Sequence, residues 1–229
     1  SGLKRIAAAC PELRRFSPEV DAMVSGLGAV DCTAVRLLLD RRCSTRFASN
    51  VISSMNGLGS MGGTYFVLER TQPVFRTSRY RGQSAVAVDL YGSEELRGET
   101  DEQIVSRAVG FLNQAEPVAF RGVQPLRTSV LRARGAATHF APGSLKSRPR
   151  QTTSISNLFL AGDFVQGLEC SAGLSQERAL CAGYTAANLC MSSLEELGRP
   201  SLQRQRVLPA APDEPHIAAL RRARRAIRW

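Results

Sequence analysis

Asp163 is the side chain whose sequence surroundings best suit ligand binding. The apolar run 155–160 predicts a buried strand, and Ala161-Gly162 lets the backbone after it pass close to another group. Asp163 would then lie at the carboxyl end of the strand, where open α/β sheets bind their ligands. The structural alternative is an ordinary strand–helix crossover with Asp163 as a surface turn residue, and the residues by themselves leave both open.

A long helix is predicted from about residue 174 to 197, ended by Gly198 and Pro200. Its start offers unpaired backbone N–H groups and the positive end of the helix dipole, which together favour a polar or anionic ligand group. Small residues recur along one side, at Ala179, Ala182 or Gly183, Ala186 and Cys190. That spacing predicts a narrow face able to lie close on a sheet.

Other candidates for chemistry are weaker. Gly57-x-Gly59-x-x-Gly62 matches the dinucleotide-binding string, but the glycines run straight into a predicted strand instead of opening a helix. A hairpin loop explains them better. His139 beside Phe140 is more typical of a packed structural histidine, so no catalytic acid or base stands out. The lack of a C-x-x-C pair and the presence of only two histidines argue against a zinc site.

These residues need a framework of strands and helices. Thr100 and Gln103 form a predicted capping box that opens a helix with apolar residues at helical spacing. The tail beyond residue 201 is broken by prolines and then predicts a short basic helix over 216–229. Alternation and branched residues predict strands over 33–39, 50–55, 64–68, 84–90 and 123–131, in addition to 155–160.

Composition narrows the class of protein. The chain has 229 residues, 43% apolar and 22% charged, which is typical of globular proteins and argues against global disorder. No apolar run approaches the roughly 20 residues that a spanning helix needs. The net charge is +10, and residues 201–229 carry +5 of it, which suggests either an acidic partner or a solvated arginine-rich tail. The six cysteines, two of them in the alanine-rich helix, are predicted to be free buried thiols in a reducing compartment.

The segment 148–190 resembles the C-terminal flavin-binding motif of the FAD-dependent amine-oxidase superfamily. The resemblance is closest to phytoene and zeta-carotene desaturases and their desaturase-like relatives. Asn157-Leu-Phe-Leu-Ala-Gly-Asp163 matches the strand and turn of that family, and Ser175-Gln-Glu-Arg-Ala179 with Ala182-Gly183 and Ala186-Ala187 matches its closing helix. Residues 138–144 and 31–40 resemble segments of the substrate domain more weakly.

The resemblance implies an α/β fold. A mixed-sheet substrate domain would be joined to the last strand and helix of a Rossmann-like FAD-binding domain, while the glycine-rich ADP-binding turn of the family's N-terminal half is absent from this sequence. The expected organisation is a helical lead-in over 1–24, a substrate-domain-like region over 25–147, the FAD-domain strand and helix over 148–198, and a basic tail over 199–229.

The resemblance also implies roles for individual residues. Asp163 would hydrogen-bond the ribityl or pyrophosphate part of FAD, and backbone amides around Phe164, Ser175 and Gln176 would approach the flavin and its phosphates. Many relatives have Met-Glu-Gly where this sequence has Gln176-Glu177-Arg178, so the environment of the flavin is expected to differ. The predicted FAD contacts are Gly162, Asp163, Phe164, Ser175, Gln176 and Ala179.

The predicted function is that of the C-terminal portion of a desaturase-like oxidoreductase acting on an apolar, carotenoid-like polyene and needing an N-terminal FAD-binding half. Location in a plastid is expected, with the arginine-rich tail holding the chain on an anionic membrane surface. The alternative is a non-catalytic structural or assembly subunit of a larger complex. Nucleic-acid binding is less favoured, because Trp229 is the only aromatic ring of Phe, Tyr or Trp type in the tail.

Overall fold

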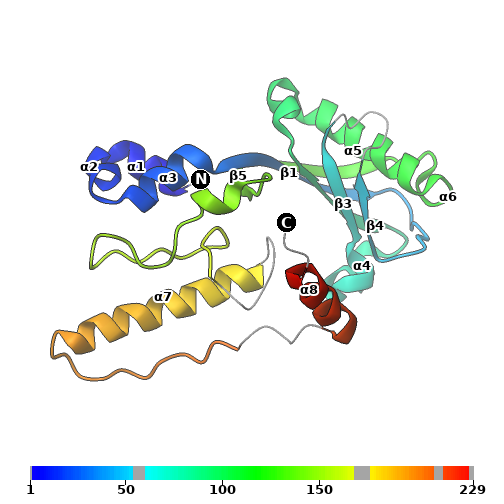
Figure 1. The fold of residues 1–229 in the computed structure, drawn as a ribbon. Coiled ribbons are helices and arrows are strands. Elements are labelled where there is room, and N and C mark those ends of the chain that lie inside the picture. The colour runs from blue at the N-terminus through cyan, green and yellow to red at the C-terminus, as the bar shows by residue number, and fades with distance from the viewer. Residues whose placement is uncertain (1, 54–59, 168–175, 209–213, 227–229) are drawn as a thin grey trace. The chain divides into compact units, whose positions relative to one another are not determined.

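The structure is a computed structural model that describes residues 2–53, 60–167, 176–208 and 214–226. The chain divides into two compact units (Figure 1). Residues 29–139 form the first, which we call the sheet unit. Residues 2–28 together with 140–229 form the second, which we call the helical unit. The predicted lead-in over 1–24 therefore belongs to the same unit as the C-terminal part of the chain.

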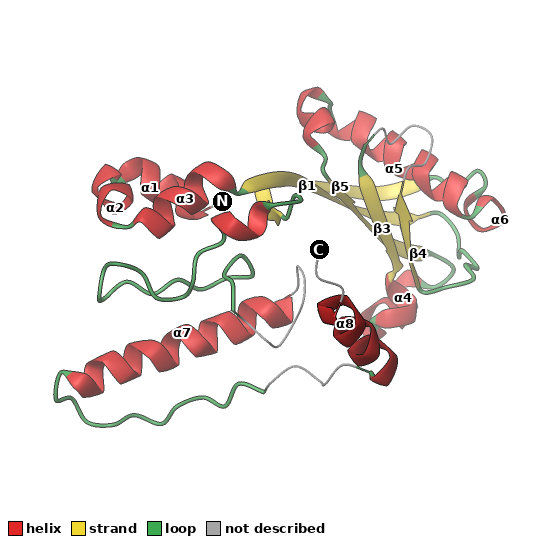
Figure 2. Ribbon diagram, in the orientation of Figure 1, coloured by secondary structure: helices red, strands yellow, loops and turns green. Residues whose placement is uncertain are grey.

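The sheet unit is built on five strands in the order β2-β3-β4-β1-β5 (Figure 2). The pairs β2–β3, β3–β4 and β4–β1 are antiparallel, with Val88 opposite both Val35 and Tyr65. The prediction of an α/β fold is confirmed. The strands are β1 (Gly28–Leu39), β2 (Ser49–Ser53), β3 (Gly62–Val67), β4 (Ser84–Tyr91) and β5 (Pro125–His139).

One face of this sheet is covered by α5 (Asp101–Ala115) (Figure 1). In β1 the side chains Val35, Leu37 and Leu39 are buried while the intervening Arg36 is exposed, as the two-residue period of a strand dictates. The buried side of α5 has helical spacing, so the two patterns meet in one apolar core. From α5 this core contains Ile104, Ala108, Phe111 and Leu112.

The start of α5 confirms the predicted capping box. The Gln103 N–H donates to the Thr100 hydroxyl at 3.3 Å, and the Thr100 N–H donates to the Gln103 side-chain oxygen at 2.8 Å. Two orphan N–H groups of the helix terminus are thereby satisfied by local sequence. Short helices interrupt the connections between the main elements. They are α4 (Leu68–Thr71) and α6 (Pro117–Phe120), with 3₁₀ turns at Pro73–Arg76, Ser78–Tyr80, Glu94–Gly98 and Ser144–Ser147.

A buried carboxylate, that of Asp31, links strands and a turn at one end of the sheet by hydrogen bonds. Asp31 accepts two hydrogen bonds from the Arg97 guanidinium, at 2.6 and 3.0 Å, and one from the Gly135 N–H at 2.9 Å. These bonds lower the pKa of Asp31 to about 2. The ionised carboxylate thus links β1, β5 and the turn that contains Arg97, a role that no sequence pattern indicated.

The helical unit contains α1 (Gly2–Ala9), α2 (Pro11–Phe16), α3 (Pro18–Gly26), α7 (Gln176–Glu196) and α8 (Pro215–Ala226). The helices predicted over 174–197 and 216–229 are confirmed within the described residues. None of the described helices is both long and apolar enough to cross a membrane. The core of this unit is small, and the buried apolar residues that cluster in it are Ala7, Val20, Leu160, Val165 and Ala182.

Two predictions need correction. Residues 155–160 do not form a strand: an isolated bridge between Thr152 and Phe159 is the only pairing there among the described residues. A strand needs a neighbour with which to exchange hydrogen bonds, and the described part of the helical unit has none beside it. No disulfide joins the described cysteines, but the prediction that they are buried holds only for Cys43: Cys10 and Cys190 are exposed, and Cys32 and Cys181 are half-buried. Cys181 and Cys190 lie on α7, whose stripe of small residues is wider than its buried face.

The glycine-rich segment joins β2 to β3, which pair antiparallel with Ser53 opposite Gly62. This connectivity agrees with the hairpin interpretation and not with a strand-to-helix dinucleotide turn. Residues 54–59 themselves lie outside the described residues.

Candidate functional site

The segment that resembles a flavin-binding motif is a looped hairpin tied to α7. The Leu160 N–H donates to the Gln151 carbonyl at 2.7 Å, and the Gln151 side-chain amide donates to the Ala182 carbonyl at 2.7 Å. Gln151 is buried, so this pair of bonds holds the hairpin against the middle of the helix. The turn at 162–165 follows directly.

Two arginines bind the backbone of that turn, and we call them the arginine clamp. The Arg148 guanidinium donates to the carbonyls of Phe164 at 2.9 Å, Val165 at 2.8 Å and Asp163 at 3.2 Å. From α7, Arg178 donates to the carbonyls of Asp163, at 2.9 Å, and Val165. The carbonyls of the turn are thus satisfied by charged donors, which make stronger hydrogen bonds than neutral ones.

The environment of the clamp is largely buried. Arg178 is 4% exposed, and the Arg148 guanidinium lies 4.7 Å from the centre of the Phe140 ring. Burial and the neighbouring charge of Arg178 lower the pKa of Arg148, while the charge of Asp163 acts in the opposite direction. In the sequence Arg178 stands out only as a departure from the resembling family, and no sequence pattern connects Arg148 with the turn.

Gly162 makes the close backbone approach that its type predicted, but the group it approaches belongs to this chain. Its φ of +143° is open to glycine and almost closed to other residues. A Cβ at this position would lie 2.4 Å from the Phe164 ring. Phe164 in turn packs against the small core of the helical unit. Both residues stay predicted cofactor contacts, and the structure gives them an internal packing role as well.

Asp163 carries a carboxylate whose charge acts on Arg148. Its backbone carbonyl is held by the clamp, whereas its half-buried side chain has no hydrogen bond or ion pair to the described residues. A carboxylate with free lone pairs accepts hydroxyl or amide donors from a ligand. Gln176, the first residue of α7, and Ala179 in its first turn are both exposed. Ser175 lies outside the described residues.

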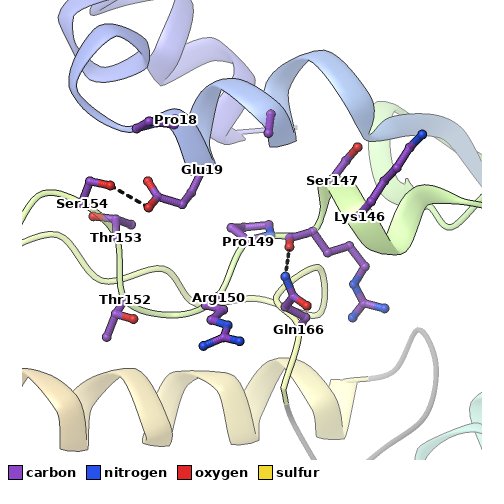
Figure 3. A pocket seen from close by; sticks show the side chains of 12 residues that line it. Pro18, Glu19, Lys146, Ser147, Pro149, Arg150, Thr152, Thr153, Ser154 and Gln166 are labelled. Carbon is purple, nitrogen blue, oxygen red and sulfur yellow. Dashed lines mark hydrogen bonds between the residues drawn. The ribbon is translucent and has the colours of Figure 1, made fainter.

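A pocket of about 540 Å³ lies between α3 and the loop residues 146–154 that precede the turn (Figure 3). Across it the Ser154 hydroxyl donates to Glu19 at 2.7 Å, and this bond is the main cause that lowers the pKa of Glu19 to about 2. Glu19 is therefore ionised near neutral pH. It joins α3 to the loop that contains Ser154, and it has no proton to donate as a general acid. Figure 3 shows Lys146 and Arg150 pointing away from Glu19 in different directions, so these cations do not converge on one anion.

The sheet unit holds an apolar pocket of about 250 Å³ on the face opposite α5. Its aromatic wall is the ring pair Phe75 and Tyr80, whose centroids are 5.4 Å apart. Apolar pockets with a few polar groups at the edge are typical binding sites for small ligands. The further lining includes Leu38, Leu68 and Ala85, with the exposed arginines Arg36 and Arg127.

Arg36 is engaged by Asp89 at 2.8 Å, and His139 is exposed at the last residue of β5. Neither side chain lies in a group of titratable residues arranged for acid–base catalysis. No sequence pattern indicated the apolar pocket, because its walls come from three segments far apart in the chain.

The comparisons with known proteins concern the fold. No family model and no curated protein matches the sequence. Among solved structures, the chain is similar to one described as "Putative protoporphyrinogen oxidase from Exiguobacterium sp. 255-15", with a TM-score of 0.54 and 13% identity. The match covers 78% of this chain and 37% of that chain, so the chain spans less than half the length of its structural neighbour. At this identity the similarity establishes a shared fold.

Proposed function

We propose that this chain supplies the substrate-domain sheet and the C-terminal cofactor-contact turn of an FAD-dependent oxidoreductase. The observation that carries the proposal is the turn at 162–165, where the arginine clamp holds the backbone and leaves the Asp163 carboxylate without a hydrogen bond or ion pair to the described residues. The same turn carries the sequence resemblance, and the fold resembles that of a protein described as an oxidase.

The residues present fit part of an FAD site. Toward the described residues Asp163 keeps acceptor capacity for a hydroxyl of the cofactor, and Gln176 and Ala179 in the first turn of α7 are exposed there. Bound flavin would supply hydride acceptance, a chemistry that no side chain offers. The chain's own contribution is to orient the cofactor through Asp163 and to exclude water around the substrate.

The remaining contacts of FAD, those to its adenosine part, would come from an N-terminal dinucleotide-binding half. For the substrate we propose an apolar molecule, of which a carotenoid-like polyene is the example that the sequence resemblance favours. The apolar pocket walled by Phe75 and Tyr80 supports the apolar character and not the identity of the substrate. Binding there would remove apolar surface from water, which is the main source of affinity for such a ligand.

The test is the flavin content of the natively purified protein with every chain that accompanies it. Bound flavin, together with a chain or segment that holds a glycine-rich dinucleotide turn, is the expected result. Asp163→Ala should lower flavin occupancy at least tenfold, whereas Glu196→Gln, an exposed change at the far end of α7, should leave it unchanged.

Native material without flavin, in which this chain is bound to unrelated subunits, would overturn the enzymatic proposal. It would instead favour the structural or assembly subunit. In flavin-containing material, Phe75→Ala should raise KM for a detergent-dispersed polyene with little change in kcat, because it removes apolar binding surface and no group that transfers a proton or hydride.

A further inference from the structure

We propose that the apolar pocket walled by Phe75 and Tyr80 binds a single-chain amphiphile whose carboxylate pairs with Arg127. The inference deepens the proposed function, on which it rests only for the view that this pocket takes the substrate. Binding itself requires no flavin, so the two proposals can fail separately. Three features carry the inference: the apolar walls of the pocket, the charge at its edge and its size.

The walls of the pocket are apolar. On the sheet, Leu38 of β1 lies opposite Ala85 of β4 in register. The aromatic wall is the ring pair Phe75 and Tyr80, which are tilted by 48° to each other. Leu38 and both rings are half-buried, so each keeps apolar surface in contact with water. A hydrocarbon chain bound here would remove that surface from water, which favours binding.

The edge of the pocket carries positive charge without a matching carboxylate. Its described lining includes Arg36 and Arg127 and no acidic side chain. Arg36 is already paired with Asp89 at 2.8 Å. The guanidinium of Arg127 is exposed and has no hydrogen bond or ion pair to the part of the chain that the structure describes. A guanidinium with free donors binds a carboxylate through charge-assisted hydrogen bonds.

The other charged groups near the pocket do not cancel this preference. Glu69 is engaged by Arg42 at 3.0 Å and by the Ser84 hydroxyl, which donates at 2.6 Å. Arg79 lies over the Tyr80 ring, with its guanidinium carbon 5.5 Å from the ring centre, and adds positive charge. The local charge therefore favours an anionic head group over a neutral or cationic one.

The volume of the pocket, about 250 Å³, limits the size of the ligand. Sites for drug-sized molecules occupy roughly 300–1,000 Å³. A smaller, open pocket accommodates one hydrocarbon chain, whereas the two chains of a membrane phospholipid exceed it. A free carboxylic acid with one apolar chain matches the size, the apolar surface and the charge of the pocket together.

The experiment is isothermal titration calorimetry of the full chain, with any chain that accompanies it, against decanoate, decanol and decylammonium. We expect decanoate to bind about tenfold more tightly than decanol, because only the carboxylate forms a charged pair with Arg127. Decylammonium should bind more weakly than decanol, since Arg127 and Arg79 repel its charge. The binding of decanoate, and not that of decanol, should weaken as salt is raised.

Substitutions separate recognition of the head group from recognition of the chain. Arg127→Gln should weaken decanoate binding about tenfold and leave decanol binding unchanged. The matched control Arg121→Gln removes an exposed charge of the same unit outside the pocket lining and should change neither affinity. Phe75→Ala should weaken both ligands by a similar factor, because it removes apolar wall and no charge.

Equal affinity for decanoate and decanol, decanoate binding unaffected by Arg127→Gln, or no binding of any of the three ligands would each overturn the inference. Decanoate binding unaffected by Phe75→Ala would place the site elsewhere and overturn it as well. Protein that discriminates the three ligands as expected but contains no flavin would contradict the flavin enzyme and leave the carboxylate site standing. Flavin-containing protein that does not discriminate them would contradict the carboxylate site alone.

Discussion

The sheet unit and the turn of the helical unit are stabilised in different ways. The sheet unit has a large apolar core in which α5 covers β1, β3 and β4, and polar groups such as Asp31 act at its edge. The turn at 162–165 has a core of few small residues, and charged side chains bind its backbone carbonyls directly. An element stabilised by apolar packing tolerates the loss of a single polar side chain, whereas the turn depends on the polar side chains that bind its backbone.

The largest effect is expected from Phe120→Ala. Phe120 is fully buried, and its ring meets the Tyr65 ring edge-on with centroids 5.7 Å apart. Its truncation leaves a cavity and should lower the free energy of unfolding by about 3–5 kcal/mol. Denaturant unfolding measures this change. A cost below about 1 kcal/mol would show that packing does not dominate the sheet unit.

Gly162→Ala should come next. Alanine must adopt a backbone conformation that is almost restricted to glycine, at a cost of about 1–3 kcal/mol, and its Cβ displaces the Phe164 ring. Amide exchange across 160–167 should accelerate while the amides of β4 stay protected. The double variant Gly162→Ala/Phe164→Ala should recover only the part of the lost stability that comes from the clash with the Phe164 ring. Full recovery would contradict the explanation from the backbone conformation.

Arg178→Ala tests the clamp. The carbonyls of Asp163 and Val165 each lose one of two charged donors, while Arg148 still binds both, so the cost in local stability should be about 1 kcal/mol per lost hydrogen bond. Hydrogen exchange should again report loosening confined to the turn. Arg178→Lys should restore only part of the amide protection that Arg178→Ala removes, because an ammonium cannot reproduce the two directed hydrogen bonds of the guanidinium. The matched control Arg199→Ala, on an exposed residue beyond α7, should have no effect there.

The smallest effect is expected in the pH dependence of the free energy of unfolding, through Asp31. The pKa of Asp31 is held at about 2, below its ordinary value, so the carboxylate contributes stability that is fully present above the unfolded pKa near 4. This contribution is lost as the pH falls from about 4 towards 2. Asp31→Asn has no such group, and its unfolding free energy should fall less steeply over that window. Equal slopes for the two proteins would contradict the assignment.

Local sequence was informative where neighbouring residues determine the structure. Thr100 and Gln103 satisfy each other across one helical turn, and the alternation around Val35 and Leu37 requires only that one face be covered. Residues 155–160 show the limit of such patterns. They have the composition of a buried strand, but pairing requires a partner strand, which the local pattern does not encode.

The candidate site divides in the same way. Asp163 and Gly162 were found from their types and spacing, because a turn after an apolar run can be recognised locally. The arginine clamp could not be found, since Arg148 and Arg178 are thirty positions apart and meet only at the carbonyls between them. An arginine beside a proline carries no signal for the backbone atoms it will bind.

The sequence by itself determined the secondary structure of the sheet unit, the two C-terminal helices, the excess of charge in the tail and the residue types of the turn. Each of these depends on contacts within a few residues or on composition. Only the tertiary structure decided that Asp31 pairs with Arg97, that Phe164 fills the space beside Gly162, and that Phe75 and Tyr80 wall an apolar pocket. The pairs Asp31–Arg97 and Phe75–Tyr80 depend on how the elements that carry them pack. The position of the Phe164 ring depends on the backbone conformation of the turn, which its neighbours in space determine.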